Sequence, residues 1–232
     1  VNPKKILISG SNLYIIGNLY EKNLVSGFST LATKSGIFSP IIKVGSKSTS
    51  LNDAIINSDG TITAVGTSGE LLMKAKSLSK ADAVTIKISS TGVLQQIARA
   101  TLKSTTRNWS SIDSGLLQAG KVSYSNKTEA AITKFSALSK PVWNVRYLSK
   151  STALATAGKN SWATFVSAGA IKNITAWKPK SSTAVVLELG KKGEILSAYT
   201  LAAPAVAISS NNEIGTVVIT DSGVSFGLVV VN

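Results

Sequence analysis

The sequence of 232 residues contains no cysteine and no histidine. Without thiols, the protein cannot form disulfide bonds or a cysteine-ligated metal site. Without imidazole or thiol groups, it cannot assemble a Ser-His-Asp or Cys-His nucleophile. The sequence also lacks an Asp-x-Asp-x-Asp calcium loop and both common glycine-rich phosphate-binding motifs. We therefore expect no catalytic residue, no bound metal and no cofactor.

Charged residues are scarce, and most of them are positive. They make up 16% of the chain, while hydrophobic residues make up 44%. Intrinsic disorder requires the opposite balance and is therefore excluded. The 25 Lys and Arg residues outnumber the 11 Asp and Glu residues, which leaves a net charge of +14. This excess predicts attraction to anionic surfaces such as nucleic acid, acidic glycans, wall polymers and acidic proteins.

Arginine is rare among these cations, since only Arg99, Arg107 and Arg146 are arginines. The planar guanidinium of arginine reads phosphates and bases specifically, whereas lysine acts as a hydrated point charge. Any binding of nucleic acid by this chain should therefore be non-specific.

No stretch approaches the roughly 20 unbroken apolar residues of a membrane-spanning helix. The closest run, from Ile214 to Val231, is interrupted by Asp221, Ser222 and Gly223. The first five residues (VNPKK) contain no apolar signal core. We therefore expect no membrane span, in a chain that is cytosolic, already processed or cropped.

Alternation of apolar and polar residues with period 2 dominates the sequence, and no segment has a convincing amphipathic helical pattern. A turn followed by a short apolar run recurs along the chain, and these runs end at residues 17, 66, 120, 166 and 219. A predicted hairpin follows each of the first four runs, over residues 29–44, 83–102, 130–148 and 184–201. Each repeat thus supplies about four strands in about 50 residues.

Four short antiparallel strands in a repeat of this length are typical of a β-propeller blade. Residues 59–69 (DGTITAVGTSG) and 86–94 (IKISSTGVL) resemble the blades of bacterial propeller repeat families, although the chain has no WD or kelch signature. The resemblance covers nearly the whole chain. It implies a fold and a display surface but no particular activity, because propellers host both binding and catalysis. A β-sandwich or a solenoid is the alternative.

We predict an all-β fold, in which a single domain over residues 1–232 forms a β-propeller-like array of about five four-stranded antiparallel units. The expected units span residues 1–48, 49–105, 106–151, 152–204 and 205–232. The last unit is incomplete, because its residues supply only three strands. An apolar strand with an open edge favours pairing with another chain. We expect a longer parent chain, a cropped chain, or an oligomer in which a neighbour donates the missing strand.

A glycosidase would need paired carboxylates that face one cleft. Asp59, Asp113 and Asp221 begin turns, where Asp satisfies local backbone donors. Asp53 is the one acid expected at the start of an inner strand, and no other unit offers it a partner there. We therefore predict that the protein is not an enzyme.

Aromatic side chains beside cations are the best candidates for binding, because they suit stacking on sugars or bases and attract acidic groups. One group lies on a predicted strand and the other in a longer connection. The candidate residues are Trp143, Arg146, Tyr147, Trp177, Lys178 and Lys180. Alternatively, Trp143 and Trp162 fill the space between blades.

Functions of different classes fit these patterns. The first is a non-catalytic secreted or cell-surface propeller that binds another protein or an anionic polymer, with nucleic acid as a non-specific ligand. The second is a structural subunit of a larger assembly, completed when its last unit pairs with a strand of another chain. The third is a glycan-active enzyme. This function is disfavoured because the sequence offers no pair of carboxylates facing one cleft.

Overall fold

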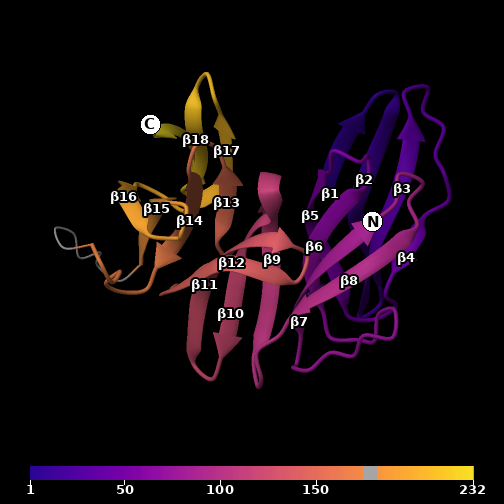
Figure 1. Ribbon diagram of the computed structural model, residues 1–232, viewed down its shortest axis with the longest axis horizontal. Coiled ribbons are helices and arrows are strands. Elements are labelled where there is room, and N and C mark those ends of the chain that lie inside the picture. The colour runs from indigo at the N-terminus through magenta and orange to yellow at the C-terminus, as the bar shows by residue number, and fades with distance from the viewer. Residues whose placement is uncertain (175–181, 232) are drawn as a thin grey trace. The chain divides into compact units, whose positions relative to one another are not determined.

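The computed structural model describes residues 1–174 and 182–231, and these residues form an array of antiparallel β-sheets (Figure 1). Four sheets have four strands each, and the last has three. Within each sheet, strands adjacent in sequence are hydrogen-bonded neighbours, which is the meander of a propeller blade. The predicted all-β array with an incomplete last unit is thus confirmed.

The first two sheets lie in residues 2–100. The first contains β1 (Asn2–Ser9), β2 (Asn12–Glu21), β3 (Leu24–Thr33) and β4 (Ile42–Val44). The second contains β5 (Thr49–Ile56), β6 (Ile62–Ser68), β7 (Asp82–Ile88) and β8 (Leu94–Ala100).

The other three sheets follow in sequence order. The third contains β9 (Thr106–Asp113), β10 (Leu117–Tyr124), β11 (Lys127–Ala137) and β12 (Lys140–Leu148), with the 3₁₀ helix η1 (Ser114–Leu116) between β9 and β10. The fourth contains β13 (Leu154–Ala157), β14 (Ser161–Ser167), β15 (Thr183–Leu189) and β16 (Ile195–Leu201). The last contains β17 (Ala205–Asn211), β18 (Gly215–Asp221) and β19 (Phe226–Val231).

The chain divides into two compact units, Val1–Ile112 and Asp113–Asn232. In the first unit, apolar side chains of the first and second sheets form one core, with Ile16, Leu51 and Ile86 fully buried. In the second unit, one core lies between the third and fourth sheets and another between the fourth and the last. The single domain over the whole chain stays a prediction.

Strand β15 shows why the fourth sheet has a core on each side. Its side chains alternate, so that Val185 and Leu187 enter the core shared with the third sheet. Ala184 and Val186 enter the core shared with the last sheet. A strand that is apolar on both faces is stable only when both faces are covered.

Polar side chains on the first strands of the sheets add links between neighbouring sheets. In the first unit, the Asp53 carboxylate lies 3.0 Å from the ammonium of Lys5 and accepts a hydrogen bond of 3.0 Å from the backbone N–H of Ile112. In the second unit, the Asp113 carboxylate accepts hydrogen bonds from the Thr156 hydroxyl and the Ala157 N–H. These carboxylates join strands from consecutive sheets.

The predicted turn roles of three aspartates are confirmed. Asp59 accepts a hydrogen bond from the N–H of Thr61, Asp221 from that of Gly223, and Asp113 from that of Ser114. The sequence did not indicate that the second carboxylate oxygen of Asp113 would reach the next sheet.

Candidate binding cleft

Three of the predicted binding residues, Trp143, Arg146 and Tyr147, lie on β12, the last strand of the third sheet. Side chains on a strand alternate between its two faces. Trp143 is therefore buried with 8% of its surface exposed, Tyr147 is half-buried, and Arg146 points to solvent. The strand thus presents Arg146 on the face opposite to its aromatic rings.

Trp143 packs into the core between the third and fourth sheets. The turn between β15 and β16 covers its ring, since a Cβ atom placed on Gly193 would lie 2.9 Å from the indole Cε3. Trp162, 6% exposed, is buried in the core between the fourth and last sheets. Both indoles therefore fill space between sheets, and ligand binding by Trp143 stays a prediction.

Tyr147 lies against the fourth sheet. Its ring stacks on that of Phe165, with the ring centres 5.5 Å apart and the planes 6° from parallel. Burial raises the pKa of Tyr147 to about 12. The phenol is therefore neutral at physiological pH and serves as a hydrogen-bond donor or acceptor.

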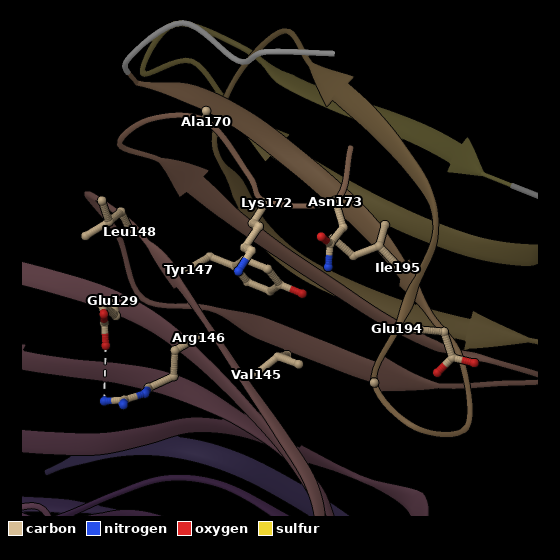
Figure 2. A pocket seen from close by; sticks show the side chains of 11 residues that line it. Glu129, Val145, Arg146, Tyr147, Leu148, Ala170, Lys172, Asn173, Glu194 and Ile195 are labelled. Atoms are coloured by element: carbon tan, nitrogen blue, oxygen red, sulfur yellow. Dashed lines mark ion pairs between the residues drawn. The ribbon is translucent and has the colours of Figure 1, made fainter. Parts of the chain in front are cut away.

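A cleft of about 400 Å³ opens above Tyr147 between the third and fourth sheets (Figure 2). Its apolar floor includes Val145 and Ile195, which also pack against the core. The polar side chains that line it are Glu129, Arg146, Tyr147, Lys172, Asn173 and Glu194. A small apolar floor with a few convergent polar groups is typical of a ligand site.

Glu129 holds the guanidinium of Arg146 in this cleft. One carboxylate oxygen of Glu129 lies 3.2 Å from Nη1 of Arg146, the ion pair drawn in Figure 2. The other accepts a hydrogen bond of 3.0 Å from the Tyr124 hydroxyl, which raises the pKa of Tyr124. A guanidinium has five N–H donors, so Arg146 is able to bind a ligand while this ion pair persists.

Lys172 and Asn173 enter the cleft from the connection that follows β14. Ile171 is 5% exposed and anchors this connection in the core. Asn173 has a φ of 75°, in the left-handed region that Asn tolerates better than most residues. The resulting turn leaves both Lys172 and Asn173 exposed.

Glu194 is engaged with its own hairpin, because its carboxylate accepts a hydrogen bond of 2.9 Å from the N–H of Lys192. Glu129 is likewise occupied by Arg146 and Tyr124. Both acids of the cleft thus have defined partners. Lys172 and the remaining donors of Arg146 are left as the groups best suited to an incoming anion.

The other predicted binding residues, Trp177, Lys178 and Lys180, lie outside the described residues, and their role stays a prediction. Our sequence analysis did not identify Lys172 and Asn173. The only signal was their place in the same connection as Trp177, five residues or fewer from it. Their position beside Tyr147 depends on how the third and fourth sheets pack.

Within residues 1–174 and 182–231, no three acidic side chains gather closely enough to hold a metal ion. No helix in these residues is both long enough and apolar enough to cross a membrane. No protein-family model matches the sequence, and no curated protein does.

Proposed function

We propose that this protein is a non-catalytic, secreted or cell-surface propeller of the bacterial repeat type that binds an anionic polymer in the cleft of the third and fourth sheets. One observation carries the proposal. Arg146, Lys172 and the neutral phenol of Tyr147 line a single cleft in a chain whose net charge is +14.

The chemistry of these groups favours an acidic glycan as the polymer. A lysine and a partly paired arginine offer point attraction to carboxylate or sulfate groups spaced along a chain. Tyr147 and Asn173 add neutral hydrogen-bonding groups of the kind that sugar hydroxyls use. A nucleic acid would favour open aromatic faces for stacking, whereas one face of Tyr147 is stacked on Phe165.

A binding role also agrees with the fact that the carboxylates on the first strands of the second and third sheets already have hydrogen-bond or ion-pair partners. Asp53 has partners in Lys5 and Ile112, and it also accepts a hydrogen bond from the N–H of Ala54. Asp113 has partners in its own turn and in the fourth sheet. Carboxylates engaged in this way support sheet packing rather than acid–base chemistry.

Replacing Lys172 by alanine tests the proposal, with polygalacturonate and its methyl-esterified form as probes. Lys172 is exposed, so its loss should leave the fold intact. We expect calorimetry to show affinity for the acidic form only, weakened about fivefold or more in Lys172→Ala at low salt, with the slope of log affinity against log salt reduced by about 1.

Lys22→Ala is the matched control, because Lys22 is an exposed lysine in the turn between β2 and β3, outside the cleft. Both variants remove one positive charge from the whole chain. Equal affinities of the two variants would mean that only net charge attracts the polymer, and the cleft would then have no role in binding.

A second candidate function is assembly into a larger structure through the last sheet. Among residues 1–174 and 182–231, no strand pairs with the outer edge of β19, whereas β18 pairs with its inner edge. An apolar edge strand of this kind is a template for another chain. Light scattering of the purified protein tests this candidate, which requires a mass above the 24.1 kDa of one chain.

A further inference from the structure

A second cleft, of about 240 Å³, opens between the third and fourth sheets, and its lining includes Lys134, Lys159 and Lys191. The three lysines come from β11, from the turn between β13 and β14, and from the turn between β15 and β16. Among the described residues, no Asp or Glu lines this cleft. We call it the lysine cleft. Positive charges that share one cleft repel one another, and a bound anion relieves that repulsion.

The position of Lys134 follows from the alternation of side chains along β11. Ala130 and Ile132 of this strand are fully buried in the core shared with the fourth sheet. Lys134 comes next on the same face and is half-buried. Its ammonium donates a hydrogen bond of 3.4 Å to the carbonyl oxygen of Ser114. An ammonium has three N–H donors, so two of them remain for a ligand.

Lys159 is exposed, in a turn that hydrogen bonds hold in place. The N–H of Gly158 donates to the carbonyl oxygen of Asn160 over 2.9 Å. The side-chain amide of Asn160 donates to the carboxylate of Glu188 over 2.7 Å, which ties the turn to β15. Binding therefore has to order only the side chain of Lys159, because its backbone is already fixed.

Lys191 is likewise exposed in a fixed turn. The N–H of Gly190 donates to the carbonyl oxygen of Glu194 over 2.8 Å, and the N–H of Gly193 donates to that of Gly190 over 3.1 Å. The carboxylate of Glu194 lies against Gly190, but it accepts a hydrogen bond from the N–H of Lys192 and lines the cleft above Tyr147 instead.

The lysine cleft keeps its positive charge. No ion pair within the described residues includes Lys134, Lys159 or Lys191. The carboxylate of Asp113 lies close by, where it accepts a hydrogen bond of 2.9 Å from the N–H of Ala157, a residue of the cleft. Its other hydrogen bonds, described above, belong to its own turn and to the fourth sheet. The three ammonium groups are thus the charged groups that an incoming ligand meets.

A single turn separates the lysine cleft from the cleft above Tyr147. The first part of the turn between β15 and β16, through Lys191, lines the lysine cleft, whereas Gly193 lines the other. A Cβ atom on Gly193 would lie 2.9 Å from the Trp143 ring and 3.3 Å from Cγ1 of Val145. These two residues of β12 are about 7 Å apart along one face of the strand. A ligand in one cleft therefore reaches the other by crossing this turn.

We propose that the lysine cleft is a second subsite for the acidic glycan, so that one polymer chain occupies both clefts across the β15–β16 turn. This inference rests on the function proposed above, and it specifies an oligomer rather than a single acidic sugar as the ligand. Two linked subsites hold one chain more tightly than either does alone, because the second contact is made within a complex that already exists. A single sugar or a free phosphate fills only one cleft.

The double variant Lys159→Ala/Lys191→Ala tests the proposal by calorimetry with oligogalacturonates of defined length. Its control is Lys22→Ala/Lys192→Ala, which removes the same charge. Lys192 is an exposed neighbour of Lys191 in the same turn, and neither Lys22 nor Lys192 lines either cleft.

We expect the affinity of the wild type and of the control to rise with oligomer length until one chain spans both clefts. The lysine-cleft variant should lose this rise and bind long oligomers at least about tenfold more weakly than the control. Its slope of log affinity against log salt for long oligomers should fall by about 2. A rise with length that persists in the lysine-cleft variant would mean that the two clefts do not share one chain, which overturns the proposal.

Lys172→Ala, measured beside Lys22→Ala, separates this inference from the proposed function. If Lys172→Ala weakens binding but the lysine-cleft variant matches its control, the first cleft binds alone and the second subsite is wrong. If neither differs from its control, the proposed function fails as well. If only the lysine-cleft variant weakens binding, the polymer does not use the cleft above Tyr147, and a shared chain is excluded. Circular dichroism matching that of the wild type shows that each variant is folded.

Discussion

At the scale of single residues, the clearest feature outside the cleft is the buried carboxylate of Glu70, which is 6% exposed. It accepts hydrogen bonds from the backbone N–H groups of Ser46 and Ser48 and from the hydroxyl of Thr49, at 3.0, 3.0 and 2.7 Å. Burial opposes its charged form, but these hydrogen bonds outweigh burial and hold the pKa of Glu70 at about 2. Glu70 thereby fixes the connection between the first two sheets.

This pKa predicts how stability depends on pH. Because the folded-state pKa lies below the ordinary value of 4.5, the contribution of Glu70 is fully present above pH 4.5 and is lost as the pH falls toward 2. Glu70→Gln should lower the free energy of unfolding by about 2–3 kcal/mol at pH 7, and by much less near pH 2. Urea unfolding at pH 7, 4 and 2.5 measures the difference.

Glu21→Gln provides the control for this prediction. Glu21 forms an ion pair of 2.9 Å with Lys43, and both side chains are more than half exposed. Such surface pairs contribute little, so this variant should change the free energy of unfolding by less than about 0.5 kcal/mol at every pH. If both variants behave alike, the buried contacts of Glu70 do not stabilise the fold.

At the scale of elements, the hairpin turn between β15 and β16 packs on Trp143 of the neighbouring sheet. Gly193 has a φ of 81° in this turn. Gly223, between β18 and β19, has a nearly identical φ of 80°, but nothing lies within 4 Å of the position of its missing Cβ. The two glycines therefore share a backbone conformation and differ in packing.

Alanine at these two positions separates backbone strain from packing. Gly223→Ala should cost about 1 kcal/mol, since a side chain there only meets an unfavourable φ. Gly193→Ala should cost at least about 1 kcal/mol more, because its Cβ also displaces the Trp143 ring. Chemical denaturation with tryptophan fluorescence measures both. Equal losses would mean that the turn does not press on Trp143 in solution.

At the scale of the whole molecule, the two proposed kinds of association should respond differently to salt. Polymer binding depends on Lys172, Arg146 and the net charge of +14, so it should weaken at least tenfold between about 0.05 M and about 0.5 M NaCl. Strand pairing at the edge of β19, the second candidate function, should persist over that range. Calorimetry with the polymer and light scattering without it, on one protein preparation, compare them.

Either measurement could contradict its proposal independently. Polymer affinity that does not change with salt would exclude an electrostatic cleft. Oligomers that dissociate at high salt would exclude strand pairing at the edge of β19 as the main cause of assembly.

Much of the fold was predictable because the evidence for it is local. The period-2 alternation within strands such as β7 and β12, together with turns at Gly60 and Gly193, indicates strand boundaries without knowledge of distant contacts. The recurrence of these signals at a regular spacing then indicates the blade-like unit. The missing fourth strand of the last sheet followed from the number of residues remaining.

The candidate cleft was only partly predictable. The alternation on β12 correctly separates Arg146 from Trp143 and Tyr147, but it does not reveal which aromatic ring reaches a cleft. That depends on the turn at Gly193, which covers Trp143, and on the connection that carries Lys172 to Tyr147. These contacts join residues of different sheets, so no short sequence window contains them.

The sequence by itself therefore determined the all-β class, the approximate number of units, the incomplete last unit and the strongly basic character of the chain. These properties follow from residue types and their spacing along the chain. Only the tertiary structure decided which side chains share the cleft and which apolar faces of the sheets cover one another within each unit. Those outcomes depend on how one sheet packs on the next, which brings together residues far apart in sequence.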